Sequence, residues 1–553
     1  MDWPDGEARQ DFLGFAIRRT PGFQDNKTGT LADYSWLPNR IGFNGPPAEG
    51  QPDFPSNKSP IQKFLWWDAR LDGLKPDFKL SYVEVILPHQ VRLGIGTWFN
   101  RAVMSSQAFS RILGALDIKN GVKPSDKEAL ILRKWLANGL EFPVPNFISS
   151  ASSIAGAIYH LTDLLWIIPS LKTKMAKSEI GLIYDAKVEK DKKTKKPKPN
   201  LNSNAIKILK KVKFFPRDKT NIMHNKYLIA GEHLLSQSGP KPTRITCGSA
   251  NYTTEGLTTQ ANLVHTFDSP ELAEVYLERV RLLKGNPKKV TTSKESGWSH
   301  TISIGDAGIR VFFSPEPGRL GKDNSQSIET IVEAIHSARS SVIFCLFMPT
   351  DEKLRQACFS VGDAGKMMFG LVNHIAREEP KSKSNLGSLH ADQLARLEMY
   401  HRSKNNKDTI GAEYFNVKLV PEGFKPEINI FPGEKPPDYP PVIIHHKFIV
   451  VDAETESPVV YTGSANMSGN SVFNNDENLL EIKGSPSIAQ TYLAEFLRLY
   501  EHYRARAHFI RYRLSGKGPL ASGYSLSKDR SWANKHFTPG TREYKARLRM
   551  LAM

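Results

Sequence analysis

The sequence predicts an α/β protein with two equivalent halves, preceded by a small β domain and followed by a basic tail. Two observations carry this prediction. Beyond residue 96, helical periodicity alternates with single apolar runs of strand length, which is the pattern of α/β units. Within these units a His-x-Lys tripeptide at residues 224–226 recurs at residues 445–447, and each copy is followed by Gly-Ser-Ala-Asn. Such a repeat indicates an internal duplication, whose halves usually pack about a pseudo-twofold axis.

Residues 1–95 differ in composition from the rest of the chain. They are rich in Pro, Gly and Trp, and short runs at residues 12–18 and 80–87 alternate polar with apolar side chains, which predicts a β-sandwich. Residues 74–82 resemble the corner and penultimate strand of a fibronectin type III sandwich, with Leu80 where that corner usually has tyrosine.

The predicted first half covers residues 96–300. Its amphipathic segments predict helices at residues 102–116 and 127–140 and a further helix within 154–175. Its apolar runs predict strands at residues 180–184, 213–215, 222–230 and 244–247.

The predicted second half covers residues 301–510 and repeats this order. Strands are expected at residues 309–313, 341–347, 368–372, 417–420 and 442–451, with helices at 327–337 and 487–503. Residues 511–553 form a basic tail that we expect to pack on the two halves.

Charge is concentrated in two segments. The chain has 75 Lys and Arg against 57 Asp and Glu, a net charge of +18. Residues 187–219 contain 13 basic and three acidic side chains, and residues 503–553 contain 12 and two. This excess favours a polyanionic partner, either nucleic acid or an anionic phospholipid, although a charge that serves solubility has the same composition. Residues 187–202 are rich in Lys and Pro, which predicts a mobile loop near the first motif.

Other classes of protein are disfavoured by what the sequence lacks. Cys247, Cys345 and Cys358 are too few and too scattered for a disulfide framework or a zinc site. The first twelve residues have neither a basic region nor an apolar core, and the apolar run at residues 164–171 is too short to cross a bilayer. A cytoplasmic protein without a transmembrane segment is therefore expected, although export without a signal remains open.

The repeated phrase combines side chains that suit the binding of a phosphate. Residues i and i+2 of a strand share a face, so His224 should project with Lys226, and His445 with Lys447, while His446 faces away. The Gly-Ser-Ala-Asn turns add hydroxyl and amide groups that can bind phosphate oxygens, from Ser249, Asn251, Ser464 and Asn466. Two such copies predict two halves of one site.

These motifs resemble the signature of the phospholipase D superfamily: His-x-Lys, four residues, Asp, and a later Gly-Ser-x-Asn. The second copy matches with His445, Lys447 and Asp452, whereas the first has Gly231 in place of the aspartate. The resemblance covers about residues 96–510 and implies two pseudo-twofold-related α/β/α halves. It also implies that Asp452 is a supporting residue and that both half-sites lie in one chain, which predicts a monomer.

The resemblance further implies that an acidic residue about eleven positions past the motif asparagine orients the histidine of the opposite half. Glu477 fits in the second half, and Gln260 is the expected equivalent in the first, although an ungapped alignment of the shared Asn-Leu pairs Ala261 instead. A carboxylate stabilises an imidazolium more than an amide does, which makes His224 the expected nucleophile and His445 the general acid. Gln260 in one half and Glu477 in the other, together with the missing aspartate of the first motif, resemble the pattern of tyrosyl-DNA phosphodiesterases.

The implied mechanism is covalent and uses no metal and no cofactor. His224 would attack phosphorus while His445 protonates the leaving oxygen, and water would then hydrolyse the phosphohistidine. Lys226, Lys447, Asn251 and Asn466 would hold the non-bridging oxygens.

Three functions stay open at this stage. The basic segments, with aromatic residues interleaved in the tail, slightly favour a nuclease. The alternatives are a phospholipase D that acts on phospholipid headgroups and a non-catalytic binding protein with a decayed site.

Overall fold

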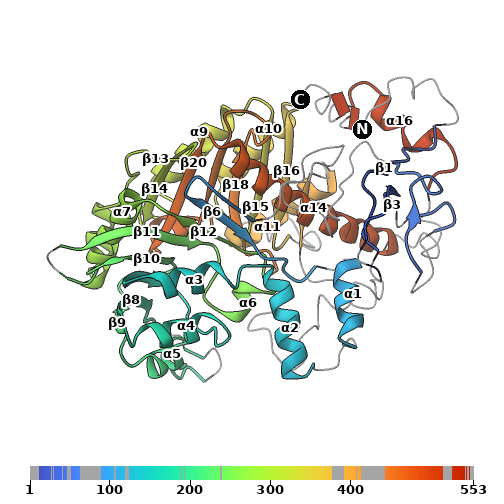
Figure 1. Cartoon of the computed structure of the whole chain (residues 1–553). Coiled ribbons are helices and arrows are strands. Elements are labelled where there is room, and N and C mark those ends of the chain that lie inside the picture. The colour runs from blue at the N-terminus through green and yellow to red at the C-terminus, as the bar shows by residue number, and fades with distance from the viewer. Residues whose placement is uncertain are drawn as a thin grey trace. The chain divides into compact units, whose positions relative to one another are not determined.

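The computed structural model describes most of the chain (Figure 1), namely residues 12–25, 28, 30–39, 41–45, 51–62, 89–104, 107–118, 124–188, 190–191, 194–236, 239–375, 391–405, 408–412, 443–514, 526–541, 543–544 and 547–548. It divides into two compact units, one formed by Pro88–Ala507 and the other by Met1–Leu87 together with His508–Met553.

The first half of the larger unit is built on an eight-stranded mixed sheet. Its strands lie in the spatial order β5 (His89–Arg92), β6 (Ile95–Phe99), β12 (Leu263–Phe267), β11 (Lys241–Gly248), β10 (Lys226–Glu232), β7 (Ser153–Ile158), β8 (Glu179–Asp185) and β9 (Lys213–Arg217). The β7–β8 and β8–β9 pairs are parallel and the others antiparallel.

The second half repeats this sheet strand for strand. Its order is β13 (Ile302–Ile304), β14 (Ala307–Ser314), β20 (Glu477–Lys483), β19 (Val459–Gly463), β18 (Lys447–Val451), β15 (Ser341–Leu346), β16 (Met367–Val372) and β17 (Thr409–Gly411). The parallel pairs again lie at the same end of the sheet, β15–β16 and β16–β17. The predicted duplication and the α/β fold class are therefore confirmed.

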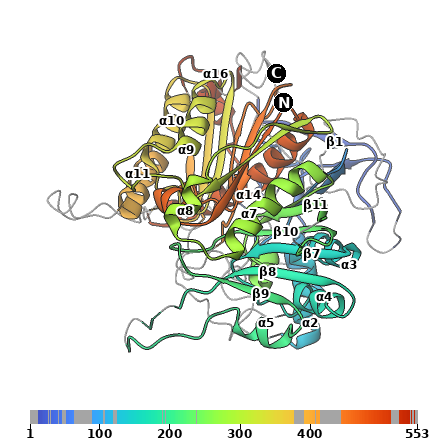
Figure 2. The same ribbon diagram turned by 90° about the vertical axis from the view of Figure 1, so that its left-hand side faces the viewer.

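Helices cover the two sheets in layers (Figure 2). The helices α3 (Pro143–Ser150), α4 (Ile167–Lys174) and α5 (Ser203–Ile208) pack on the outer face of the first sheet. Those of the second sheet are α9 (Gln326–His336), α10 (Glu352–Asp363) and α11 (Ala391–Asn405). Between the sheets, one continuous core joins strands of both halves with α7 (Pro270–Lys284) and α14 (Pro486–Leu514). The two halves thus share the largest apolar cluster, which fixes how their motifs meet.

The other described helices of this unit lie in the connections between these elements. They are α1 (Gln107–Ala115), α2 (Asp126–Ala137), α6 (Thr254–Leu257), α8 (Lys289–Lys294) and α13 (Gly469–Phe473). The start of α2 shows how the sequence sets such boundaries: Ser125 and Glu128 form a capping box that satisfies backbone N–H groups of the first turn. None of the described helices combines the length and the apolar character that crossing a bilayer requires.

Several strands were not predicted, among them β6, β12, β19 and β20, and β7 lies where a helix was expected. Ser153–Ile158 form β7, whereas the predicted helix within residues 154–175 is limited to α4. Every residue of β7 is buried, and a Cβ on Gly156 would lie 2.5 Å from the backbone oxygen of Tyr227 on the adjacent strand. Ile154 and Ile158 pack in the core beneath α3 and α4, and Ala155 and Ala157 pack in the core between the sheets. Both faces are therefore apolar, which removes the alternation that marks a half-buried strand.

The smaller unit contains two short sheets within its described residues. Strands β1 (Arg18–Arg19) and β2 (Ser35–Trp36) form one, and β3 (Pro38–Asn39) and β4 (Phe54–Pro55) the other. The C-terminal segment joins this unit through Trp532, whose indole N–H donates to the backbone oxygen of Phe12 (2.9 Å), close to the helix α16 (Asn534–Phe537). The predicted sandwich corner at residues 74–82 and the predicted strand at residues 417–420 lie outside the described residues.

Candidate active site

Each His-x-Lys motif lies where a central strand begins and where the opposite half makes a backbone bridge. Lys226 and Lys447 are the first residues of β10 and β18, and each histidine precedes its lysine by two positions. The backbone N–H of His224 donates to the backbone oxygen of Asp476 (2.9 Å), and that of His445 donates to the oxygen of Ala261 (3.1 Å). The two bridges are equivalent, so each motif strand is clamped by the other half.

This arrangement brings the four predicted side chains into one buried cluster. His224 and His445 are each 6% exposed, Lys226 2% and Lys447 0%. The ammonium group of each lysine donates to the backbone oxygen of its own histidine, at 2.6 Å in the first half and 2.7 Å in the second. The ammonium groups of Lys226 and Lys447, one from each half, are thereby buried together.

Burial and mutual repulsion shift the titration of this cluster. The pKa of His224 and that of His445 are lowered well below 6.5, mainly by burial and then by both lysines. Burial also lowers the pKa of Lys226, to which Lys447 contributes, and it lowers the pKa of Lys447 to about 7. Both imidazoles are therefore neutral at neutral pH, and each keeps one nitrogen lone pair.

The histidines receive different support from the opposite halves. The Nδ1 atom of His224 lies 3.4 Å from a carboxylate oxygen of Glu477, whose pKa burial raises to about 7. The Nδ1 atom of His445 lies 2.8 Å from the side-chain oxygen of Asn262. The amide group of Asn262 donates to the backbone oxygen of Gly256 (2.9 Å), which fixes its orientation. An amide oxygen only accepts, so the contact assigns the proton to Nδ1 of His445 and leaves Nε2 of the neutral ring unprotonated.

Asn262 is a correction to the sequence-based assignment of Gln260. The bonds from Ser249 N–H to the oxygen of Leu263 and from Ser464 N–H to that of Asn478 set the same register in both halves, which makes Asn262 the equivalent of Glu477. The side-chain oxygen of Gln260 is buried and bonds to no described residue. The sequence spacing could have identified Asn262, because Asn262 and Glu477 each lie eleven positions after the asparagine of their Gly-Ser-Ala-Asn.

The two motif serines are also corrected, because their hydroxyl groups serve the backbone. Ser249 donates to Asn262 (2.9 Å) and accepts from the N–H of Leu263 (3.1 Å), and Ser464 accepts from the N–H of Asn478 (3.0 Å). Both serines are fully buried. They fasten the motif turn to the following strand and leave no hydroxyl for a phosphate.

The motif asparagines remain suited to a ligand. Asn251 and Asn466 are half-buried, and their side-chain oxygens bond to no residue that the structure describes.

The motif aspartate of the second half has a structural role. The carboxylate of Asp452 accepts backbone N–H groups of Arg339 (2.9 Å), Ser340 (2.9 Å) and Ser341 (3.1 Å), where α9 leads into β15. In the first half Gly231 lies at a β-bulge, and a Cβ there would be 2.2 Å from the backbone oxygen of Lys241. The missing aspartate therefore follows from a close backbone approach, and β10 is well formed without it.

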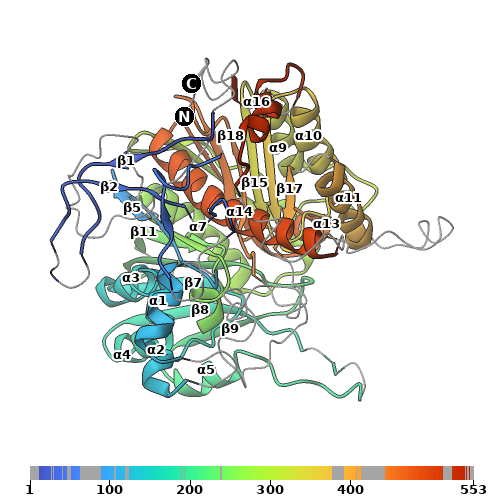
Figure 3. The ribbon, with the colours of Figure 1, turned by 90° about the vertical axis from the view of Figure 1, so that its right-hand side faces the viewer.

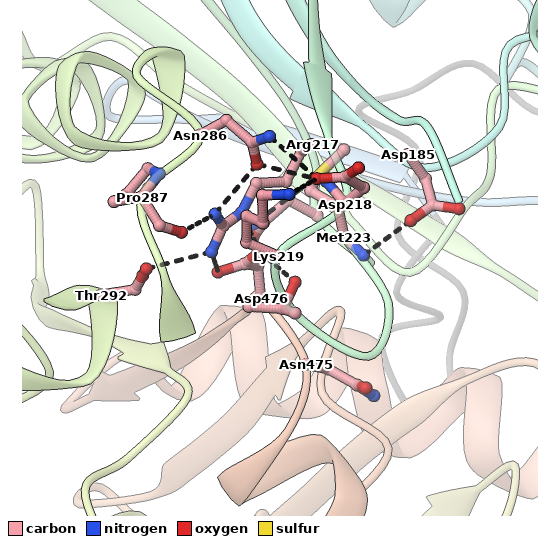
Figure 4. A network of polar contacts seen from close by, with 12 residues as sticks. Asp185, Arg217, Asp218, Lys219, Met223, Asn286, Pro287, Thr292, Asn475 and Asp476 are labelled. Atoms are coloured by element: carbon pink, nitrogen blue, oxygen red, sulfur yellow. Dashed lines mark hydrogen bonds and ion pairs between the residues drawn. The ribbon is translucent and has the colours of Figure 1, made fainter. Parts of the chain in front are cut away.

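A buried ion pair beside the site was not predicted (Figure 4). Nε of Arg217, at the end of β9, donates to the carboxylate of Asp476 (2.7 Å), and both side chains are 0% exposed. The hydroxyl of Thr220 donates to the same carboxylate (2.6 Å), and Arg217 also donates to Thr292 (3.0 Å). Because Asp476 precedes Glu477 and its backbone holds His224, this pair anchors the support of the first histidine. No motif in the sequence marks it.

Aromatic rings line the lysines in matching positions. The ammonium of Lys226 lies 5.2 Å from the ring centroid of Tyr159, and that of Lys447 lies 5.5 Å from the centroid of Phe347. Such cation–π contacts stabilise a desolvated charge. His446 faces away as predicted, with Nε2 3.1 Å from a carboxylate oxygen of Glu495. Across the described ranges, no group of three or more His, Cys, Asp or Glu has the geometry of a metal site.

Residues 331–500 match a protein-family model described as "Cardiolipin synthase, PLD-like domain". No curated protein sequence matches the chain. Among solved structures, phosphatidylserine synthase from Haemophilus influenzae Rd KW20 is 11% identical and covers 72% of this chain and 91% of its own, with a TM-score of 0.44.

Two further structures are similar. Yeast tyrosyl-DNA phosphodiesterase is 12% identical and covers 60% of this chain and 82% of its own, with a TM-score of 0.30. Nuc from Salmonella typhimurium, titled a phospholipase D family member, is 20% identical and covers 25% and 82%, with a TM-score of 0.20. Since no TM-score reaches 0.5, the family assignment depends on the match over residues 331–500.

Proposed function

Because this chain belongs to the phospholipase D superfamily, we propose that it is an enzyme that hydrolyses a phosphodiester through a covalent phosphohistidine. The observation that carries the proposal is the meeting of two neutral imidazoles and two ammonium groups, one of each from either half, in one buried cluster. A non-catalytic protein has no use for four basic groups whose desolvation disfavours the fold.

His224 is the nucleophile in this proposal. With its proton on Nδ1, toward Glu477, it keeps a lone pair on Nε2 that attacks phosphorus. The new P–N bond places positive charge on the ring, which the Glu477 carboxylate stabilises. The ester bond opposite the attacking nitrogen breaks as the P–N bond forms.

His445 is the general acid. Its Nδ1 proton is held by Asn262, so a second proton must enter at Nε2 before it can be given to the leaving oxygen. The negative charge of a bound phosphodiester favours that uptake. In the second step the neutral Nε2 takes a proton from water, the hydroxide attacks phosphorus, and the P–N bond breaks to restore His224.

The other charged groups stabilise the reacting phosphate. Lys226 and Lys447 hold positive charge where the non-bridging oxygens gather negative charge, in a place from which water is largely excluded. The side chains of Asn251 and Asn466 add hydrogen bonds to the same oxygens. No step in this scheme uses a metal ion or a cofactor.

Nucleic acid is the substrate class that we propose first. Between β8 and α5, the described residues 186–188, 190–191 and 194–202 belong to the teal loop that extends from the first half in Figures 2 and 3. Lys190, Lys195, Lys196 and Lys198 are exposed there, and none forms an ion pair with a described residue. The loop leaves the fold beside the nucleophile, since Lys187 at its base donates to the backbone oxygen of Asn221 (2.7 Å). A row of unpaired ammonium groups suits a polymeric phosphate backbone.

A phospholipid substrate is the second candidate, and a different observation favours it. Leu164 and Leu165 are 54% and 37% exposed in the turn between β7 and α4, and Leu201 at the base of the lysine loop is 58% exposed. Apolar side chains beside lysines are typical of a surface that meets anionic lipid.

One experiment tests the chemistry. The protein is incubated in EDTA with plasmid DNA, a single-stranded oligonucleotide and phosphatidylcholine vesicles, beside His224→Ala and His445→Ala variants. We expect the wild type to cleave at least one substrate and both variants to lose at least about 100-fold, the contribution of a positioned acid or base. Wild-type rates in either variant would refute the mechanism. Inactivity on every substrate would favour the binding protein with a decayed site.

A second experiment separates the substrates. Replacing Lys190, Lys195, Lys196 and Lys198 with serine should weaken DNA cleavage and flatten its dependence on salt, by up to about one unit of slope for each ammonium group that no longer neutralises a phosphate. Lys353→Ser with Lys404→Ser, on the outer helices α10 and α11, serves as the control. If vesicle hydrolysis is present and falls on replacing Leu164 and Leu165 with serine, while DNA is left intact, the phospholipid candidate replaces the nuclease.

A further inference from the structure

His160 is a third histidine at the candidate active site, and it lies outside both motifs. It belongs to a segment after β7 that is held by the His-x-Lys motif and the Gly-Ser-Ala-Asn motif of the first half. On one side, the N–H of Tyr159 donates to the backbone oxygen of Asn225 (2.9 Å), between the motif histidine and lysine. On the other, the N–H of Thr162 donates to the oxygen of Tyr252 (3.0 Å), which follows the motif asparagine. The position of His160 is therefore set by the same residues that build the site.

The ring of His160 is connected to the nucleophile through one aromatic ring. It stacks on Tyr159 with centroids 3.6 Å apart and an interplanar angle of 20°. The Tyr159 ring meets His224 edge-on at 4.9 Å and lies under the ammonium of Lys226. The ring of His160 is thus separated from that of His224 by the Tyr159 ring alone.

No described residue is a hydrogen-bond partner of the His160 ring. Its ring is half-buried and makes no hydrogen bond to the part of the chain that the structure describes. Burial, with a smaller effect from Lys226, lowers its pKa to about 4. A neutral imidazole has one N–H to donate, and the ring nitrogens of His160 are not among the buried atoms that lack a partner, so this N–H is open to solvent and available to a ligand.

The second half lacks a donor at the equivalent position. Phe347 corresponds to Tyr159, because its N–H donates to the backbone oxygen of His446 (3.0 Å) and its ring lies 5.6 Å from His445. Met348 therefore stands where the first half has His160. Since the halves otherwise repeat each other closely, the exchange of His for Met marks a difference between the two sides of the bound phosphate.

We propose that His160 binds substrate by donating its N–H to the part of the phosphodiester that stays on His224 in the covalent intermediate. This inference rests on the proposed function. In-line attack places the leaving group opposite His224, toward His445. A donor beyond His224 therefore faces the retained ester and its oxygens, and its hydrogen bond persists in both steps of the reaction.

The test uses two esters that share p-nitrophenol as leaving group and differ in the retained group, thymidine 5′-(p-nitrophenyl phosphate) and bis(p-nitrophenyl) phosphate. His160→Phe keeps the stack on Tyr159 and removes the donor. We expect KM to rise about tenfold on both esters, the loss of one hydrogen bond, with kcat within about threefold. His160→Gln restores an N–H and should bring KM back toward the wild-type value.

The controls separate binding from structure. Met348→Leu, at the equivalent position of the second half, should leave KM unchanged, and the melting temperature should be equal in all variants. An unchanged KM in His160→Phe would overturn the inference while leaving the proposed function intact. Equal losses in the Phe and Gln variants with a lowered melting temperature would also overturn it, in favour of a packing role. A wild type that hydrolyses neither ester and traps no phosphohistidine would contradict both.

Discussion

Asn262 and His445 meet across the two halves at 2.8 Å, from the amide oxygen to Nδ1. The equivalent pair, Glu477 and His224, meets at 3.4 Å with a carboxylate in place of the amide. The site is therefore nearly symmetric in its histidines and lysines and asymmetric in what supports them. An amide fixes a tautomer, whereas a carboxylate also stabilises the charged ring. This difference is the physical basis for assigning two roles to two equal histidines.

The support of His445 can be tested at Asn262. We expect Asn262→Leu to slow the reaction about 10- to 100-fold, because a general acid that is free to rotate loses part of its contribution of about 10²–10⁴. Asn262→Asp should raise the pKa of His445 and move the descending limb of the kcat/KM pH profile to higher pH. Gln260→Leu is the matched control and should behave as wild type. A greater loss in Gln260→Leu than in Asn262→Leu would restore the sequence-based assignment.

Glu477 and Lys447 should give the protein a minimum of stability near pH 7. Burial raises the pKa of Glu477 from 4.5 to about 7. The folded state then holds this proton more tightly than the unfolded chain, so the free energy of unfolding falls between pH 4.5 and 7. The pKa of Lys447 is lowered from 10.5 to about 7, so between these values the unfolded chain binds more protons, and stability rises with pH.

Urea denaturation at pH 5, 7 and 9 measures this profile. Glu477→Gln should remove the decrease between pH 5 and 7 and should inactivate the enzyme, since a neutral amide does not stabilise the charged His224. A profile that is unchanged in this variant would show that Glu477 does not titrate in this range.

The buried pair of Arg217 and Asp476 should be costly to break. Arg217→Met leaves a buried carboxylate without its closest cation, and we expect a loss of about 3–5 kcal/mol in the free energy of unfolding. The Lys213–Glu179 pair nearby is exposed, at 60% and 38%, so Lys213→Met should cost less than about 1 kcal/mol. Adding Asp476→Leu to Arg217→Met should recover part of the loss. Similar losses for the buried and the exposed pair would contradict this account.

Both motif aspartate positions should lose stability on substitution, the first when an aspartate is introduced and the second when it is removed. Completing the first motif with Gly231→Asp forces a Cβ against the backbone of β11, and we expect a cost of at least about 1–3 kcal/mol and no gain in activity. Asp452→Ala leaves three backbone N–H groups without their acceptor and should cost at least about 2 kcal/mol. Asp452→Asn should cost less, because it keeps one oxygen and tolerates the backbone φ of 54°. Thermal or urea unfolding ranks the three variants, and a stable Gly231→Asp would contradict the close approach.

The sequence predicted the duplicated α/β fold and the four basic side chains because both depend on short-range patterns. A His-x-Lys at the start of an apolar strand has a defined direction, and its recurrence excluded chance. The strand β7 escaped prediction because both of its faces are apolar, which leaves no strand periodicity. Three-dimensional contact, rather than local preference, determines such a strand.

The supporting residues were harder to predict for a related reason. Gln260, Ala261 and Asn262 are adjacent, and only the register of β12 against β11 determines which of them reaches His445. The motif serines looked like phosphate ligands by residue type, but the backbone of the next strand already uses their hydroxyl groups. Arg217 and Asp476 lie far apart in sequence, and no local pattern joins them.

The backbone bridges Met223–Asp476 and Ala261–Ile444 join the two halves and have a consequence for the protein during its synthesis. Each histidine is held by residues that are translated with the other half, so a nascent chain that has completed only its first half carries no working centre. Under the proposed function, the centre is complete only when the second half has been synthesised and has folded against the first. His224 then cannot act as a nucleophile before both halves are in place, and damage to either half removes the support of both histidines.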